Sequence, residues 1–570
     1  MKYNTHTLFF TKVLKPLSLK NLWLSFVLCA LITPSTTWSM PFEGQDMLIA
    51  APSPIAVETG KEIHKLGGNV FDVAVAVALS LSVTSPYFAS LGGGGFALVK
   101  KEGEAVKALD FRETAPAKTH ENYYSSLAEG SSWNGGAAVG VPGIPAGLYE
   151  IHKTYGKLKW EQLFTRPLQQ AIQGFPVSGE WYNYTLSQKD RFNAKGKQVF
   201  LKKNGTPYVP GETIKQPDLY QALKLFRDKK LEGFYSGAVA ADIAQTVQKE
   251  GGVLSVEDLK NYKVKWREPM QTQFQGHDIY LMPPPSSGGV VIKTALALVE
   301  KLDLKKYGYM SVDEFHMLAE VMSKSFRGRA LLGDPDFTKL PLDQLLSENY
   351  INELAKNIKP KYSKKMKPLD ESFLGQESTE TTHFVVMNKK GEAVSMTITL
   401  NGNYGSGVSS NKYGIALNNE MDDFQAIPGQ ANIYGLLHSK TNYVHAGKRP
   451  LSSKSPTLVL KDNSTVMALG APGGPRIING VFQTLYRVLV NELDVEKAIM
   501  TPRLHHQFEP NILFYEQQNF TPETLRLLKM RKHTLKATRG VAKVSAVRIN
   551  KKGFLEAYSD FRGEGAVGGF

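Results

Sequence analysis

Two threonines and an asparagine carry side chains that could act together in covalent chemistry: Thr381, Thr399 and Asn401. Two runs with strand character flank the sequence Asn388–Gly391, in which asparagine at the first position and glycine at the fourth favour a type I turn with a glycine bulge. Counting outward from that turn places Thr381 opposite Thr399, with Asn401 one step beyond on the same face. The spacing therefore predicts two hydroxyls and an amide at the open end of a hairpin, although a slip of one residue would turn Thr399 to the other face.

A second hairpin is predicted further along, with strands near 457–460 and 465–469. It runs into the sequence Gly470-Ala471-Pro472-Gly473-Gly474, and Pro475 then suits the first turn of a helix. Glycine amides at the start of a helix form a natural site for an anion or an oxyanion. Gly473 and Gly474 are therefore candidates for such a site, while a glycine bend without any function remains the alternative.

The elements that must position these residues alternate between helix and strand patterns from about residue 55 to 300. A nearly continuous apolar run at 70–83 follows Asn69 and predicts a buried, capped helix. Strands are expected at 96–100 and 105–111 around Gly103, and a capping box at Ser311 begins another helix. The four glycines at 92–95 have no phosphate-loop spacing and predict close packing instead.

The stretch 359–380 differs in composition, because it is rich in lysine, serine and acids and poor in apolar residues. Such a composition predicts an exposed, mobile linker. The pattern after it becomes rich in strands. A simple linker between domains is the plain interpretation of this segment.

Residues 1–39 have the features of a signal peptide: four lysines, no acid, an apolar run at 22–32 and small residues before Ser39. The apolar run is short for a bilayer span. Cys29 lies in this leader and is the only cysteine, so the mature chain is expected to have no disulfide. We therefore expect a periplasmic or secreted bacterial protein with no membrane segment after leader removal.

The chain has 570 residues, is 42% hydrophobic and carries a formal net charge of +15. These values are typical of a soluble globular protein. The lysines are scattered and no nucleic-acid-binding module is recognisable, so no nucleic-acid partner is expected.

Seven short motifs, in this order and spacing, resemble the γ-glutamyltransferase (γ-glutamyltranspeptidase) family of N-terminal nucleophile hydrolases. They are LDFRETAP (109–116), VGVPG (139–143), PPPSSGG (283–289), TTHFVV (381–386), LNNEMDDF (417–424), KRPLSSKSPT (448–457) and GAPGGPRI (470–477). The resemblance runs from about Met47 to the C-terminus. It implies an α+β fold, a four-layer αββα sandwich. It also implies a precursor that cleaves itself at the end of this mobile linker, between Glu380 and Thr381, into a heterodimer of a large fragment (40–380) and a small one (381–570).

This cleavage would create the catalyst. A threonine hydroxyl needs a base beside it, and a free α-amine with a pKa near ~7.7–8.0 can serve. While Glu380 is attached, the nitrogen of Thr381 is an amide and cannot accept the proton. We expect Thr381 Oγ to attack the carbonyl of Glu380, and the ester so formed to be hydrolysed. Thr399, by resemblance, hydrogen-bonds Thr381, whereas a threonine chosen only for strand propensity is the alternative.

The resemblance also implies a set of substrate-binding residues. A carboxylate calls for a guanidinium and hydroxyls, and an ammonium calls for acids and amide oxygens. The residues that match the family's ligands are Arg112, Ser452 and Ser453 for the carboxylate, Asp423 with Glu420 and Asn401 for the ammonium, Gly473 and Gly474 for the oxyanion, and Tyr434 in a lid loop at 428–437. Asp422 is expected to be a solvated turn residue.

The expected activity is transfer of the γ-glutamyl group from glutathione and related amides to amino acids, peptides or water. No cofactor and no metal are expected, and the neighbouring His505 and His506 would point in opposite directions in a strand. One alternative is an amide acylase of the same fold, of the cephalosporin or glutaryl acylase type. Another is a non-catalytic binding protein, which would have lost the nucleophile or remained uncleaved.

Overall fold

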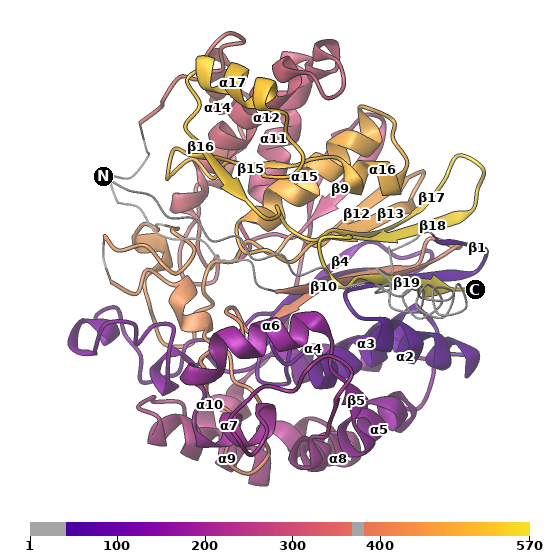
Figure 1. Ribbon diagram of the computed structural model, residues 1–570, viewed down its shortest axis with the longest axis vertical. Coiled ribbons are helices and arrows are strands. Elements are labelled where there is room, and N and C mark those ends of the chain that lie inside the picture. Colours follow the sequence, from indigo (N-terminus) through magenta and orange to yellow (C-terminus); the bar gives the residue numbers. More distant parts are fainter. Residues whose placement is uncertain (1–41, 368–380, 428, 437) are drawn as a thin grey trace, which may run out of the picture.

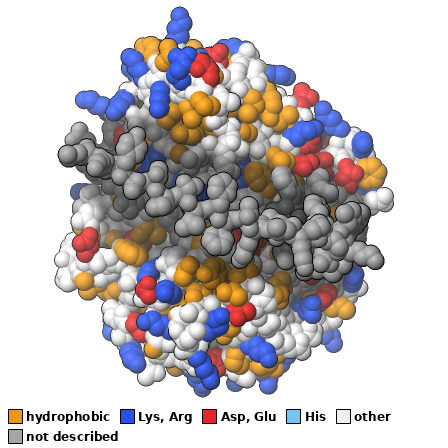
Figure 2. Space-filling model, in the orientation of Figure 1, with side chains coloured by type: hydrophobic (Ala, Val, Ile, Leu, Met, Phe, Trp, Pro, Cys, Tyr) orange, Lys and Arg blue, Asp and Glu red, His pale blue; other side chains and the backbone are white. Residues whose placement is uncertain are grey.

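The computed structural model describes residues 42–367, 381–427, 429–436 and 438–570. The predicted leader, Glu380 and most of the predicted linker therefore lie outside the described residues. Within the described part of the chain, no helix is long and apolar enough to cross a membrane. On the face drawn in Figure 2, Lys and Arg side chains are spread around the surface instead of forming a single patch.

Two seven-stranded sheets form the centre of the molecule (Figure 1). Neighbouring strands within each sheet are antiparallel. The strand order of one sheet is β19 (Ala566–Gly569), β2 (Met47–Ala51), β10 (Thr382–Asn388), β11 (Ala393–Thr399), β3 (Gly94–Lys100), β4 (Lys107–Phe111), β7 (Lys265–Arg267). The order of the other is β1 (Phe42–Gly44), β18 (Leu555–Ser559), β17 (Ser545–Ile549), β13 (Ser464–Gly470), β12 (Thr457–Lys461), β9 (His277–Leu281), β8 (Met270–Phe274).

Helices cover the outer face of each sheet (Figure 1). The layer over the β10 sheet contains α2 (Pro54–Lys65), α3 (Val70–Thr84), α4 (Ile144–Tyr155), α5 (Thr165–Gln173), α6 (Gly179–Gln188), α7 (Ala194–Phe200), α8 (Pro217–Tyr235), α9 (Gly237–Lys249) and α10 (Val256–Asn261). The layer over the β13 sheet contains α11 (Gly288–Leu302), α12 (Val312–Phe326), α13 (Leu342–Leu345), α14 (Glu348–Lys356), α15 (Arg476–Leu489), α16 (Val495–Met500) and α17 (Pro522–Met530). Two small sheets lie outside this frame: β14 (Leu504–His505), β15 (Leu513–Glu516) and β16 (Leu535–Thr538), and the pair β5 (Phe175–Pro176) and β6 (Thr213–Ile214).

Three apolar cores correspond to these layers. One packs α3 and its neighbours against the β10 sheet, and a second packs α11, α12 and α15 against the β13 sheet. The third contains inward-facing residues of both sheets, among them Phe96, Val385, Leu458 and Val547. Burial of apolar area on both faces of each sheet drives this arrangement. It confirms the expected four-layer αββα sandwich.

The predicted cleavage point at residue 380 does not divide the fold into two separate units. Strands from before and after this position contribute to both sheets, and β10 lies between β2 and β11. The two predicted fragments would therefore share both sheets.

Most of the predicted elements are confirmed. Every residue of α3 is buried, and Asn69 caps it by accepting hydrogen bonds from the amides of Phe71 and Asp72. The strand pair around Gly103 corresponds to β3 and β4. The capping box at Ser311 differs in one respect, because the carboxylate of Glu314 accepts from the amide of Met310 instead of that of Ser311.

Candidate active site

The β10–β11 hairpin has the predicted register. Thr382 pairs with Ile398 and Met387 with Ala393, which fixes Thr381 opposite Thr399. The hydroxyl of Thr399 lies 3.3 Å from that of Thr381 and hydrogen-bonds it. The backbone amide of Asn401 donates to the same Thr399 oxygen at 3.0 Å. The hydroxyl of Thr399 is therefore held between this amide and the hydroxyl of Thr381. The register follows from the turn, in which Gly391 adopts a φ of 80°.

The glycines at 92–95 bring β3 against this hairpin. A Cβ on Gly93 would lie 2.0 Å from the carbonyl oxygen of Thr399, and one on Gly95 would lie 2.3 Å from that of Thr397. These contacts are too close for any side chain. The glycines therefore provide close packing behind Thr399, as predicted.

The second hairpin delivers the glycine turn to the same place. Gly473 and Gly474 have φ angles of 136° and 55°, which suit glycine, and α15 begins directly after Pro475. Within the described part of the chain, neither glycine amide donates a hydrogen bond to another protein group. Two unused N–H donors at a helix N-terminus are well suited to an anion.

A small pocket brings the predicted residues together. It contains about 270 Å³ of space free of protein atoms, part of which is open to solvent. Its lining consists of Thr381, Asn401, Asp423, Tyr434, Leu436, Ser452, Ser453, Lys454, Gly474, Pro475 and Ile477. The hydroxyl of Thr381 thus shares one cavity with residues from the glycine turn, the paired serines and the acidic turn.

Arg112 lies behind this pocket and is completely buried. Its guanidinium donates to the Glu420 carboxylate and, at 2.5 Å, to Asp423 Oδ2, while its Nε donates to the carbonyl oxygen of Pro450 at 3.2 Å. Burial lowers the pKa of Arg112, but the carboxylates of Glu420 and Asp423 outweigh it and hold that pKa above its ordinary value. The residues predicted to bind opposite ends of a ligand therefore bind each other here.

Two further charged groups belong to this cluster, and neither was predicted from the sequence. Lys454 donates from Nζ to Glu420 Oε1 at 2.8 Å, and burial lowers the pKa of its ammonium. Glu113 lies 3.6 Å from the Arg112 guanidinium, and its carboxyl oxygens have no hydrogen-bond partner among the described residues. Burial, reinforced by the charge of Glu420, raises the pKa of Glu113 well above its ordinary value, which favours the protonated form of this carboxyl. Glu113 directly follows Arg112, and Lys454 directly follows Ser453, both inside the motifs quoted above. This adjacency was the signal in the sequence that could have identified them.

The lid prediction concerned residues 428–437, of which 429–436 are described. The side chain of Tyr434 is buried in the pocket, and its hydroxyl donates to the carbonyl oxygen of Asn401 at 3.0 Å. Asn432 donates from Nδ2 to Asp423 Oδ1 at 3.1 Å. The loop therefore covers one side of the pocket and contacts the acidic turn directly.

The expectation for Asp422 was wrong. Its side chain is buried, and it accepts hydrogen bonds from Ser132 Oγ at 2.7 Å and from the amide of Ile433 at 2.9 Å. Asp422 therefore links the loop 429–436 to Ser132. It is buried because it lies in a short 3-10 helix (Glu420–Asp423) whose four residues are all buried. Burial raises the pKa of Asp422 to about 7.

Residues 56–570 match the sequence profile described as Gamma-glutamyltranspeptidase. The chain belongs to the gamma-glutamyltranspeptidase family. This membership covers all of the residues that surround the Thr381 pocket.

Curated relatives in this family match along most of their length. The chain is 36% identical over 532 residues to the glutathione hydrolase proenzyme of Escherichia coli (strain K12), covering 92% of this chain and 91% of that protein. It is 37% identical over 528 residues to the glutathione hydrolase proenzyme of Pseudomonas aeruginosa, and the match covers 91% of this chain and 93% of that protein.

Solved structures confirm the fold of this gamma-glutamyltranspeptidase family member. The Helicobacter pylori gamma-glutamyltranspeptidase structure aligns with a TM-score of 0.54 and 34% identity over 56% of this chain and 96% of that one. A cephalosporin acylase from Bacillus halodurans aligns with a TM-score of 0.82 over 95% and 98% of the two chains, at 24% identity. At that identity the acylase shares the fold and supports no conclusion about substrate.

His383, His505 and His506 are each buried and held by neighbouring side chains. His383 lies beside Thr397, with Nδ1 2.8 Å from its hydroxyl, and burial lowers the pKa of His383 to about 3. His505 and His506 are buried and hydrogen-bonded to amide side chains. Among the described residues, no group of three or more His, Cys, Asp or Glu side chains could hold a metal ion.

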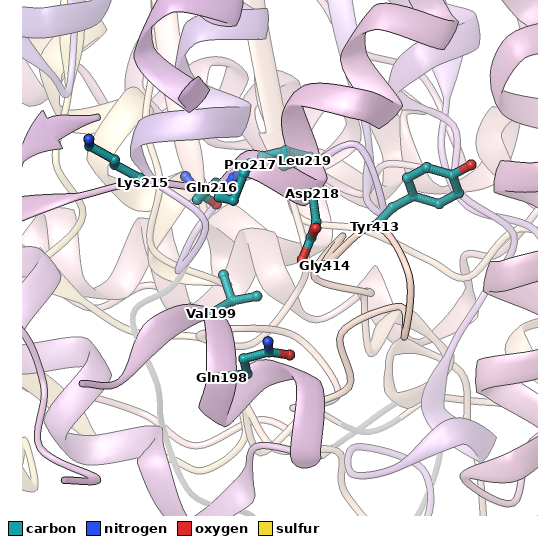
Figure 3. Close-up of a pocket in the computed structure, with 9 residues that line it drawn as sticks. All are labelled: Gln198, Val199, Lys215, Gln216, Pro217, Asp218, Leu219, Tyr413 and Gly414. Carbon is teal, nitrogen blue, oxygen red and sulfur yellow. The ribbon is translucent and has the colours of Figure 1, made fainter. Parts of the chain in front are cut away.

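A second pocket lies between α7 and the start of α8 (Figure 3). Gln198 and Val199 line it from α7, and Tyr413 and Gly414 close its other side. Its lining includes none of the predicted site residues, and its acid, Asp218, pairs with Lys195 at 2.6 Å. The Thr381 pocket is therefore the candidate active site.

The raised pKa of Asp422 predicts how stability depends on pH. Between about pH 4 and 7 the folded protein holds a proton that the unfolded chain has lost. The free energy of unfolding therefore falls as the pH rises through this window, by at most about 4 kcal/mol, and the loss is complete above pH 7. We expect Asp422→Asn, whose amide can still accept from Ile433 and donate to Ser132, to reduce this fall.

Melting temperatures at pH 5 and pH 8 measure this effect. The decrease between the two pH values should be smaller in Asp422→Asn than in the wild type, whereas the surface variant Asp218→Asn should behave as the wild type does. An unchanged pH dependence in Asp422→Asn would show that the carboxyl is already ionised at pH 5.

Proposed function

We propose that the protein is a γ-glutamyl transferase and hydrolase, which takes the γ-glutamyl group from glutathione and related amides and passes it to amino acids, peptides or water. One observation carries the proposal: a buried cluster of opposite charges, Arg112 with Glu420 and Asp423, adjoins the pocket of Thr381. A substrate end with a carboxylate and an ammonium is complementary to such a cluster. The family membership and the names of the curated relatives support the same activity.

Substrate binding exchanges ion pairs. The α-carboxylate of the γ-glutamyl group takes Arg112, Ser452 and Ser453 as partners, and its ammonium takes Glu420, Asp423 and the side chain of Asn401. Each of these charged protein groups exchanges a protein partner for a substrate group that carries the same charge as the partner it replaces. A ligand that carries only one of the two charges would leave a buried protein charge unpaired, which costs several kcal/mol.

Thr381 becomes the nucleophile when the precursor cleaves itself. Its hydroxyl attacks the carbonyl carbon of Glu380, the C–N bond breaks as the C–O bond forms, and the nitrogen takes up a proton. Water then hydrolyses the ester and leaves a free α-amine on Thr381. The φ of 140° at Thr381 supports this step, because such a conformation costs a β-branched residue about 1–3 kcal/mol that cleavage would release.

The mature reaction repeats this chemistry on the substrate. The α-amine of Thr381 takes the hydroxyl proton as Oγ attacks the γ-carbonyl, and the amides of Gly473 and Gly474 stabilise the oxyanion, by about 3 kcal/mol for each donor. The amine then gives the proton to the leaving nitrogen. An acceptor amine or water attacks the ester on Thr381 and releases the γ-glutamyl group.

The leader and the two fragments complete the proposal. Residues 1–39 direct export to the periplasm or exterior, and the fragments 40–380 and 381–570 remain together as a heterodimer. The shared sheets support this assembly, because separating the fragments would expose the edges of β10 and β2.

Turnover of two chromogenic amides tests the function. The purified, processed protein should release p-nitroaniline from γ-glutamyl-p-nitroanilide, and added glycylglycine should increase the rate if a peptide accepts the acyl group. Glutaryl-p-nitroanilide, which lacks the ammonium, should react at least about 100-fold more slowly. A preference for the glutaryl substrate would identify an acylase, and binding without turnover of either would identify a binding protein.

A further inference from the structure

One buried cation next to the pocket, Arg329, touches no carboxylate in the part of the chain that the structure describes, and burial lowers its pKa to about 10 although the more distant charge of Asp423 opposes this in part. Arg329 follows α12, its residue is 4% exposed, and no carboxylate lies within 4 Å of its guanidinium among the described residues. Four arginines that are almost completely buried each contact a carboxylate: Arg112, Arg449, Arg487 and Arg503. A buried charge without a counter-ion is costly unless a ligand supplies one.

The partners of Arg329 are all neutral. Its Nε donates to Ser287 Oγ at 3.1 Å and its second terminal nitrogen to Ser453 Oγ at 3.3 Å. The remaining nitrogen lies 3.5 Å from Nδ1 of His438. Burial, together with the positive charge of Arg329, lowers the pKa of His438 well below its ordinary value, so this ring is neutral and its Nδ1 accepts.

These contacts dictate where the hydroxyl of Ser453 points. A guanidinium can only donate, so Ser453 Oγ accepts from Arg329 through a lone pair and its own hydrogen must point elsewhere. Ser287 has already used its hydrogen on the carbonyl oxygen of Ser452, at 2.8 Å. The hydrogen of Ser453 has no acceptor among the described residues, and this side chain lines the Thr381 pocket.

We propose that Arg329 is a positioning residue for substrate: it orients the Ser453 hydroxyl to donate into the pocket and supplies a positive charge that the α-carboxylate of the γ-glutamyl group neutralises. The inference rests on the proposed function and assigns a second arginine to the recognition of that carboxylate. Arg112 is already paired with Glu420 and Asp423, whereas Arg329 contacts none of the described carboxylates and only the more distant charge of Asp423 favours its ionised form.

Lys454 and Ser452 form a parallel arrangement with one difference. The ammonium of Lys454 lies 3.5 Å from Ser452 Oγ, which therefore also accepts from a cation. However, Lys454 contacts Glu420 at 2.8 Å and so has its counter-ion within the protein. Of these two cations, only Arg329 lacks direct contact with a carboxylate of the described residues, so a substrate carboxylate beside Ser453 would be its nearest counter-ion, and removal of Arg329 should weaken substrate binding selectively.

Steady-state kinetics with γ-glutamyl-p-nitroanilide test this role, once the wild type has been found to turn the substrate over. Because a hydrogen bond to a charged group is involved, we expect Arg329→Gln to raise KM about 10- to 100-fold and to change kcat by less than about 3-fold. Arg329→Lys, which keeps the charge, should recover most of the lost affinity. Arg327→Gln is the matched control, because Arg327 lies two residues away and pairs with Glu353 near the surface.

A double-mutant cycle with Ser453→Ala separates positioning from general structural damage. If Arg329 acts through Ser453, adding Arg329→Gln to Ser453→Ala should raise KM by clearly less than Arg329→Gln does in the wild type. Fully additive losses, a loss confined to kcat, or equal loss in Arg329→Lys and Arg329→Gln would overturn the inference. If Arg329→Gln fails to fold, Arg329→Met, an unbranched side chain without the charge, takes its place in the cycle. Absence of wild-type turnover would instead refute the proposed function.

Discussion

Thr381→Ala should remain a single chain of full precursor length and should have no detectable γ-glutamyl transfer. The variant removes the only atom proposed to attack the carbonyl of Glu380, and without cleavage the α-amine that serves as the base never forms. We expect two bands for the wild type and one for the variant on a denaturing gel. Thr381→Ser should still cleave, because it retains the hydroxyl.

The neighbouring threonine provides the matched control. Thr382 is buried at the start of β10, directly after Thr381, and its hydroxyl has no hydrogen-bond partner among the described residues, whereas that of Thr381 is bound by Thr399. Thr382→Ala should therefore be processed like the wild type. Normal processing of Thr381→Ala would rule out Thr381 as the nucleophile of cleavage.

The second large effect is expected at Arg112. Arg112→Gln removes the guanidinium that pairs with Glu420 and Asp423, so it deprives the substrate carboxylate of its partner and leaves Asp423 with only a neutral hydrogen bond, from Asn432. Breaking a buried ion pair costs about 3–5 kcal/mol. We expect kcat/KM for γ-glutamyl-p-nitroanilide to fall at least about 100- to 1,000-fold, together with a lower melting temperature.

A double variant distinguishes lost binding from lost stability. In Arg112→Gln/Asp423→Asn both charges are gone, so the melting temperature should recover towards the wild-type value while kcat/KM stays low. Arg548→Gln disrupts an ion pair with Glu556 that is remote from the pocket. It should change neither the melting temperature nor kcat/KM strongly. Recovery of kcat/KM in the double variant would mean that Arg112 supports only the fold.

The parts of this site that depend on local spacing could be predicted from the sequence. The turn at Asn388–Gly391 fixes the register of its hairpin, and the period of two then places Thr381 opposite Thr399. The glycine turn at Gly473 and Gly474 is likewise local. The four layers of the fold were expected only from family resemblance, because strand periodicity does not specify which sheets stack.

The charge pairing could not be predicted, because it joins residues that are distant in the chain. Arg112 meets Glu420 across 308 positions, and only the folded sheets bring them together. Asp422 was misjudged for a related reason: adjacent acids in a turn usually face solvent, but here the lid loop covers them. Arg329 lies outside every recognised motif, and its missing counter-ion is visible only in three dimensions.

The most direct test of the central claim is the N-terminal residue of the small fragment. We predict that sequencing of the processed protein gives Thr-Thr-His, with an intact mass equal to residues 381–570, and that brief exposure to a γ-glutamyl donor adds one γ-glutamyl group to this fragment. An active protein that is a single chain, or one whose small fragment begins at any residue other than Thr381, would contradict the account.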